Sequence, residues 1–285
     1  MRKEVMVAYV PVALNDPGDM QKAVQEVFQG EYESGHFGDN LTILDIGGNL
    51  GSFSLWATMR WPGSRIHTYE PNPETFKLLR DNLSKHRNVT CHNVAVYPSD
   101  KHTMPFWSRG PGDGEAGLVE YMAKTFRQLA ASNVVEVPIL HPDRLPDADI
   151  IKIDAEGAEG KIVSHMRPEQ LKQTSLILME YQDSDNLAVI KNHLKSGFDV
   201  DYEDQFPWDK ILDKSQYRTE LRGQYYGRIF FTNKRIHDLG KLTPHKGTKV
   251  VLSDYMPRKV PLRQILSMVP EAFSDAVKRR IRRLL

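Results

Sequence analysis

The stretch LDIGGNLGSF at residues 44–53 places an aspartate and three glycines between two apolar runs. Glycine lets a main chain turn sharply and approach a ligand closely, because it has no Cβ. A second carboxylate, Glu70, ends the next apolar run, nineteen residues after Gly51. A carboxylate at such a strand end can accept hydrogen bonds from both hydroxyls of a ribose. Asp45 and Glu70 together therefore favour a nucleoside ligand.

Two common nucleotide sites do not match this pattern. A G-x-G-x-x-G turn would need glycine at the position of Ile46, so a nicotinamide cofactor is disfavoured. The motif G-x-x-x-x-G-K-[ST] is absent, which disfavours ATP and GTP. A nucleoside that carries an amino acid in place of phosphates is S-adenosylmethionine. The alternatives are a tight turn that binds no ligand and, for Glu70, a solvated residue at a strand end.

These residues need elements that position them, and short apolar runs alternate with amphipathic stretches along the chain. Strands are predicted at 42–47, 65–70, 89–96, 134–140, 148–154, 175–181, 198–204 and 225–233. Helices are predicted at 20–29, 52–61, 73–86, 155–166 and 186–197. The alternation indicates a parallel sheet covered on both faces, and the last two strands, without a helix between them, indicate an antiparallel edge hairpin. The Gly-rich segment 99–132 breaks the rhythm as a lid or a disordered loop.

Charge is distributed unevenly along the 285 residues. The net charge is +1, but residues 256–285 carry +6 and the remainder −5, so nucleic acid is an unlikely partner of the body. A single cysteine, Cys91, favours a reducing, cytoplasmic compartment. The C-terminal stretch has apolar residues at helical spacing between basic ones. Such a helix would contact a membrane surface peripherally, dock on the acidic body or remain solvated.

Four stretches, DIGGNLGSFSL, YEPNPETFKLLRDNL, VAV and IIKIDAEGAEGKIV, occur in an order that resembles the FkbM-type family of class I methyltransferases. The resemblance covers roughly residues 25–235. It implies a Rossmann-like α/β fold with a mostly parallel seven-stranded sheet, an antiparallel edge hairpin and helices on both faces. It also implies S-adenosylmethionine as the cofactor. We therefore expect an N-terminal extension at 1–38, a methyltransferase domain at 39–235 and a C-terminal appendage with a basic amphipathic helix at 236–285.

The same resemblance assigns roles to residues at the strand ends. The methionine side of the cofactor would be lined by Asp45, Gly47, Gly48, Asn49 and Gly51. Glu70 would bind the ribose. Asn72 and Asn93 would flank the adenine, and Asp154 would lie near the amino-acid group or the methyl. Independently of the resemblance, Asn93 and Val94 end the third predicted strand, where an adenine edge would lie.

Methyl transfer from a sulfonium needs positioning of the acceptor and removal of its proton. Three acids, Asp154, Glu156 and Glu159, follow one predicted strand closely, and their mutual repulsion would raise a pKa toward the range of a useful base. Glu156 is the first candidate base and Glu180, at the next strand end, the second. The alternative for Glu159 is a first-turn helix residue favoured by the helix dipole.

His141 and His165 are further candidate bases, although a lone histidine more often has a structural role. No H-x-x-x-H or paired-acid arrangement indicates a metal, so metal-independent transfer is expected. The preferred function is O-methylation of a hydroxyl on a sugar, a glycan or a secondary metabolite. The alternatives are N-methylation of a peptide or nucleic acid, and a catalytically silent nucleoside-binding module.

Overall fold

The computed structural model of the protein describes residues 27, 31–32, 40–208, 216–218, 221 and 223–235. The predicted extension at 1–38 lies outside these residues except for positions 27, 31 and 32. The predicted C-terminal appendage lies wholly outside them. Within the described part, no helix combines the length and the apolar character needed to traverse a bilayer.

The main sheet has the strand order β10-β12-β9-β8-β1-β2-β3, with the short β11 paired beside β12. Its strands are β1 (Thr42–Ile46), β2 (Arg65–Tyr69), β3 (Val89–His92), β8 (Ile150–Ile153), β9 (Leu176–Tyr181), β10 (Phe198–Glu203), β11 (Phe206–Pro207) and β12 (Tyr225–Asn233). The pairs among β9, β8, β1, β2 and β3 are parallel, and β12 is antiparallel to β9 and β10. These pairings confirm the mostly parallel sheet with an antiparallel edge.

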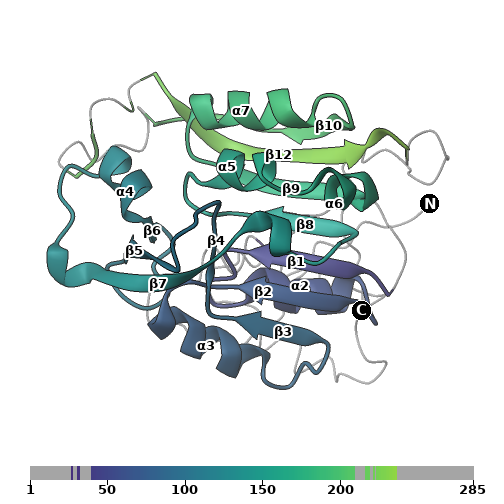
Figure 1. Ribbon diagram of the computed structural model, residues 1–285, viewed down its shortest axis with the longest axis horizontal. Coiled ribbons are helices and arrows are strands. Elements are labelled where there is room, and N and C mark those ends of the chain that lie inside the picture. The colour runs from purple at the N-terminus through teal and green to yellow at the C-terminus, as the bar shows by residue number, and fades with distance from the viewer. Residues whose placement is uncertain are drawn as a thin grey trace, which may run out of the picture.

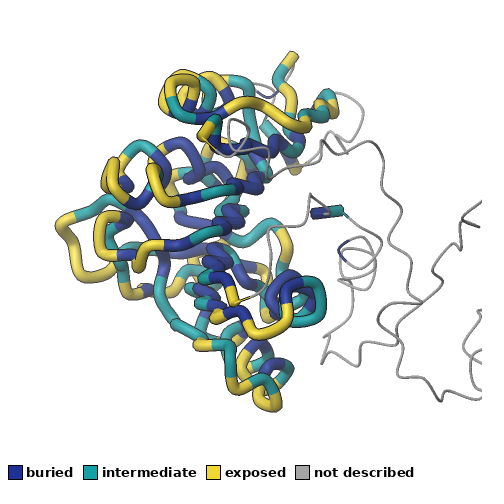
Figure 2. Tube along the Cα trace, turned by 90° about the vertical axis from the view of Figure 1, so that its right-hand side faces the viewer, coloured by how far each residue is buried: buried dark blue, intermediate teal, exposed yellow. Residues whose placement is uncertain are grey.

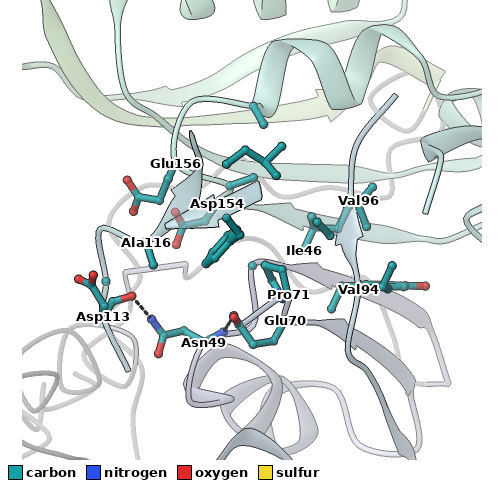
Figure 3. Close-up of a pocket in the computed structure, with 18 residues that line it drawn as sticks. Ile46, Asn49, Glu70, Pro71, Val94, Val96, Asp113, Ala116, Asp154 and Glu156 are labelled. Carbon is teal, nitrogen blue, oxygen red and sulfur yellow. Dashed lines mark hydrogen bonds between the residues drawn. The ribbon is translucent and has the colours of Figure 1, made fainter. Parts of the chain in front are cut away.

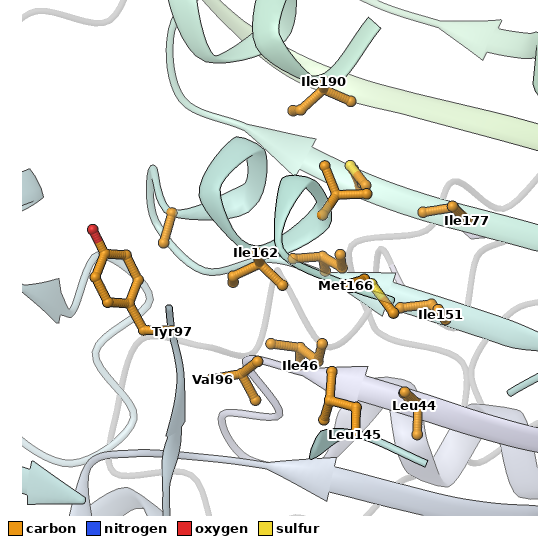
Figure 4. Close-up of a cluster of buried hydrophobic side chains, with 14 of the residues drawn as sticks. Leu44, Ile46, Val96, Tyr97, Leu145, Ile151, Ile162, Met166, Ile177 and Ile190 are labelled. Carbon is orange, nitrogen blue, oxygen red and sulfur yellow. The ribbon is translucent and has the colours of Figure 1, made fainter. Parts of the chain in front are cut away.

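Side chains alternate between the two faces of the sheet, as the pleat of a strand requires. On β1, Ile43 contributes to a core with α2 (Ser52–Arg60), whereas Leu44 and Ile46 contribute to a larger core with α5 (Glu159–Ser164) and α7 (Ser184–Leu194). Figure 4 shows part of this larger core, and Figure 2 shows buried positions in the interior of the fold and exposed ones on its outer loops. The remaining helices are α3 (Pro73–Leu83), α4 (Val119–Thr125), α6 (Pro168–Gln173) and the short 3-10 turns Ala131–Asn133 and Pro142–Arg144.

The segment 99–132, predicted as a lid or a disordered loop, contributes instead to a second, smaller sheet. This sheet has the order β4-β7-β5-β6 and contains β4 (Ala95–Val96), β5 (Thr103–Trp107), β6 (Gly117–Leu118) and β7 (Val134–Leu140). The predicted strand at 89–96 is divided, because the Asn93 side-chain amide donates to the carbonyls of Glu70 and Pro71 and β4 then pairs with β7. The second sheet lies beside the carboxyl ends of the parallel strands (Figure 1).

Close contacts within the protein require glycine in the turn between β1 and α2. Gly47 and Gly51 have φ angles of 80° and 87°, which favour glycine. A Cβ on Gly47 would lie 1.8 Å from the carbonyl oxygen of Asp154, and one on Gly48 would lie 2.1 Å from Oγ1 of Thr68. The backbone N–H groups of Gly47 and Gly48 both donate to the carbonyl of Tyr69. The turn is therefore held tightly between β2 and β8.

Replacing Gly48 by alanine should destabilise the protein by about 1–3 kcal/mol, because the added methyl overpacks the contact with Thr68 and Leu79. Urea unfolding measures this change. Gly197→Ala is the matched control, since a Cβ there meets nothing within 4 Å, and it should change stability by less than about 0.5 kcal/mol. Equal unfolding midpoints for the two variants would contradict the packing argument.

Candidate cofactor and active site

A cavity lies at the carboxyl ends of β1, β2 and β8, and the second sheet and the loop 108–116 close its other side (Figure 3). This is where ligands bind in open parallel sheets. Its walls are formed by Ile46, Gly47, Asn49, Tyr69, Glu70, Pro71, Val94, Ala95, Val96, Phe106, Asp113, Gly114, Ala116, Leu118, Asp154, Ala155, Glu156 and Ala158. Glu70 and Asn49 lie on one side of it and Glu156 on the other.

Glu70 brings a buried carboxylate to the end of β2, with only 6% of the residue exposed. Its Oε1 accepts from the backbone N–H of Asn72 at 2.8 Å and its Oε2 from that of Asn49 at 2.9 Å. Burial raises the pKa of Glu70 to about 7, and the two backbone hydrogen bonds oppose this shift. Each carboxylate oxygen has a second lone pair for a ligand hydroxyl, so the group is held in place and still able to accept.

Asn49 joins the glycine turn to the loop that covers the cavity. It has a positive φ of 44°, and its Nδ2 donates to the carbonyl of Asp113 at 3.3 Å (Figure 3). Its Oδ1 is buried without a hydrogen-bond partner in the structure. A buried acceptor of this kind calls for a donor. The loop is also tied down by the Gly112 N–H, which donates to Oγ1 of Thr75 at 3.0 Å.

The wall next to Glu70 is apolar and contains Tyr69, Pro71 and Val94. Tyr69 is kept in position by stacking on His92, with ring centroids 4.6 Å apart. Flat apolar surfaces of this type suit a purine ring. Of the predicted adenine neighbours, Val94 is therefore the one in the wall.

Asn72 and Asn93 lie outside the cavity walls and support them instead. The Asn72 side chain caps α3 by accepting from the N–H groups of Glu74 and Thr75, at 3.0 and 3.4 Å. The Asn93 amide donates to the carbonyls of Glu70 and Pro71, at 2.8 and 3.0 Å. Both side chains thus shape the chain around Glu70.

Asp45 also lies outside the cavity walls, fully buried between the sheet and α2. Because β1 alternates, Asp45 shares the face of Ile43. It accepts from the hydroxyls of Ser54 at 2.7 Å and Thr68 at 3.2 Å, and Nζ of Lys152 lies 3.4 Å from its Oδ1. Gly48 and Gly51 are likewise behind the wall. These residues hold the turn, whereas Gly47 and Asn49 line the cavity.

The predicted acids after β8 have distinct places. Asp154 and Glu156 line the cavity. Burial raises the pKa of Glu156 well above its usual range, and the charges of Asp154 and Glu180 add to the shift. Glu156 has a φ of 51°, unusual for a residue with a side chain. Because a raised pKa makes the ionised carboxylate a stronger base, the Glu156 carboxylate is suited to accept a proton in this cavity.

Glu159 holds the turn in which Glu156 lies. It is fully buried, and its carboxylate accepts from the N–H groups of Ala155 at 2.8 Å and Gly157 at 3.1 Å and from the amide of Asn186. Burial raises its pKa to about 7. Glu159 therefore combines the expected first-turn position with a hydrogen-bonding role.

Glu180 is on the sheet face that carries Asp45 and Lys152, and it does not line the cavity. Burial raises its pKa well above the usual value, with Asp154 as the largest neighbouring cause. His141 and His165 are outside the cavity walls as well. His141 contacts Asp143 at 2.6 Å, and His165 follows the last turn of α5.

Two parts of the site were not predicted. Lys152, which binds the carbonyl of Gly47, stands out in the sequence as a lysine within an apolar strand, a signal of a paired buried charge. The loop residues Asp113, Gly114 and Ala116 carry no such signal. Their place depends on contacts with α3 and the glycine turn.

Comparison with known proteins shows a match to the methyltransferase FkbM domain over residues 45–200. Methyltransferase 1 of Beauveria bassiana (strain ARSEF 2860) is 26% identical over 196 residues, which cover 60% of this chain and 78% of that protein. The 31-O-demethyl-FK506 methyltransferase FkbM of Streptomyces tacrolimicus is 42% identical over 45 residues, which cover 16% of this chain and 17% of that protein.

Among solved structures, precorrin-6y C5,15-methyltransferase from Geobacter metallireducens GS-15 is similar with a TM-score of 0.39 and 18% identity, over 74% of this chain and 89% of that one. The FkbM match covers more than half of the chain and includes the glycine turn, Glu70 and the acids after β8. This chain belongs to the methyltransferase FkbM domain family.

Proposed function

We propose that this methyltransferase uses S-adenosylmethionine to methylate a hydroxyl group of a sugar, a glycan or a secondary metabolite. The observation that supports it most strongly is the buried Glu70 carboxylate, held by two backbone N–H groups beside the unpartnered Oδ1 of Asn49. A carboxylate and an amide oxygen beside an apolar wall fit a nucleoside with ribose hydroxyls and a purine ring.

In this proposal Glu70 accepts from the ribose hydroxyls, and Tyr69, Pro71 and Val94 contact the adenine. Asp154 faces the amino-acid portion. When bound, the cofactor supplies an electrophilic methyl group on a sulfonium. The protein contributes orientation, which accounts for much of the acceleration of a two-substrate displacement.

Glu156 is the proposed base, since it lines the cavity and its pKa is raised by burial and by Asp154. Glu156 would accept the proton that the acceptor hydroxyl loses, and the bound cofactor would supply the methyl group. Asp154, which also lines the cavity, is the alternative for this role, whereas Glu180 does not line it. A hydroxyl acceptor is supported by the relative named a 31-O-demethyl-FK506 methyltransferase. The aligned stretch covers 16% of this chain.

The acceptor is identified by incubating the protein with cofactor labelled in the methyl group and with panels of glycans, natural products, peptides and RNA. Label on an oxygen of a glycan or natural product is the expected result. Label on a peptide or nucleic-acid nitrogen would replace the proposal with N-methylation. Cofactor binding without any labelled product would indicate a silent nucleoside-binding module.

Glu70 should make the binding of S-adenosylhomocysteine depend on pH. With a pKa of about 7, the side chain is mostly protonated at pH 6 and mostly ionised at pH 8. Because the carboxylate accepts from the ribose, calorimetry should show binding that is roughly tenfold tighter at pH 8. Glu70→Gln should weaken binding by about 1–3 kcal/mol and remove the pH dependence. Glu74→Gln, at an exposed acid nearby, should retain both; the same slope in Glu70→Gln would refute the assignment.

Substitutions of Glu156 should affect activity and stability in different ways. Glu156→Gly and Glu156→Ala both remove the base, and methyl transfer should fall about 10²–10⁴-fold. Because φ is 51° at this position, the glycine variant should be more stable in urea than the alanine variant by about 1 kcal/mol. Glu156→Gln, which keeps the shape of the side chain, is the control for activity. Full turnover in that variant would move the role of base to Asp154.

A further inference from the structure

Lys152 is a buried lysine at the centre of the strand ends that form the site. It lies on β8 in register with Asp45 on β1, and only 4% of it is exposed. Its Nζ donates to the carbonyl of Gly47 at 2.7 Å. It lies 3.4 Å from Oδ1 of Asp45 and 3.3 Å from Oδ2 of Asp154. One ammonium group thus contacts both the glycine turn and an acid in the cavity wall.

The positive charge of Lys152 is stabilised by the neighbouring carboxylates, and it compensates them in turn. Burial alone would lower the pKa of the ammonium, but Asp154 and Asp45 outweigh this effect and raise the pKa above its usual value. Arg228, on the same sheet face in β12, is engaged by Asp204 at 2.6 Å and Glu31 at 3.3 Å. Within the part of the chain that the structure describes, the ion pairs of Asp45 and Asp154 are with Lys152.

The glycine turn and Asp154 are also in direct contact. The Asp154 N–H donates to the carbonyl of Ile46 at 3.0 Å, and a Cβ on Gly47 would overlap the Asp154 carbonyl. The Asp154 side chain, by contrast, is 25% exposed and has room to turn toward solvent. Its ion pair with Lys152 restrains that freedom.

We propose that Lys152 is a positioning residue, which fixes the Asp154 carboxylate and the Gly47 carbonyl where the amino-acid end of the cofactor is bound. This inference rests on the proposed function. Lys152 itself is behind the cavity wall, so it acts through Asp154 and the turn. The part of its effect on cofactor affinity that passes through Asp154 should therefore disappear when Asp154 can no longer form the ion pair.

A double-mutant cycle with S-adenosylhomocysteine as the probe tests this coupling by calorimetry. Lys152→Met and Asp154→Asn should each weaken binding at least tenfold, and the loss in the double variant should be clearly smaller than the product of the two single losses. Fully multiplicative losses would overturn the proposal. Failure of the wild-type protein to bind the probe would instead overturn the proposed function.

A control must distinguish loss of folding from loss of binding, because Lys152→Met leaves the buried charge of Asp45 uncompensated. The pair Lys152→Met with Asp45→Asn removes both charges and should recover most of the thermal unfolding temperature lost in Lys152→Met. It should still bind the probe at least tenfold more weakly than the wild type. Wild-type affinity in this stable variant would show a structural role only. Lys161→Met, at an exposed lysine on α5, should leave both temperature and affinity unchanged.

Discussion

The buried ion pair between Asp45 and Lys152 is the interaction on which the rest of the structure depends. Both residues are inside the sheet, on neighbouring strands and in register, and both are buried. Two buried charges are tolerable only if each compensates the other and finds further hydrogen bonds. Ser54 and Thr68 supply these to Asp45, and the Gly47 carbonyl supplies one to Lys152. These interactions fix the carboxyl ends of β1, β2 and β8 relative to one another. Those ends form one side of the cavity.

Polar residues in the motif divide into two groups with different tasks. Asp45, Asn72, Asn93 and Glu159 use their hydrogen bonds on the protein, to shape the turns around the cavity. Glu70, Asn49, Asp154 and Glu156 present oxygens at the cavity itself. The glycines belong mainly to the first group, because the missing Cβ atoms make room for Asp154, Thr68 and Leu83. A short motif can therefore shape a cavity although few of its side chains line it.

Sequence patterns predicted the β1-α2-β2-α3 succession and the strand-end position of Glu70 because these depend on local periodicity and turn chemistry. The burial of Asp45 also follows from periodicity, because Asp45 comes two residues after Ile43 and lies on the same face of the strand. The glycine motif around Asp45 had instead predicted a ligand contact for its side chain. The second sheet was not predictable in the same way. Its β4 pairs with β7, far along the chain, and its loop is held by Thr75 on α3. Such contacts arise from tertiary structure and leave little trace in a single sequence.

The position of β12 constrains the order in which the strands of the nascent chain can pair. Among the described strands, β12 is synthesised last, yet it lies between β9 and β10. While the nascent chain leaves the ribosome, the free edge of β9 has no partner, and β10 has no strand on which to dock. Unpaired edges of this kind invite association with other chains. The main sheet can therefore reach its final strand order only after residue 233 has been synthesised.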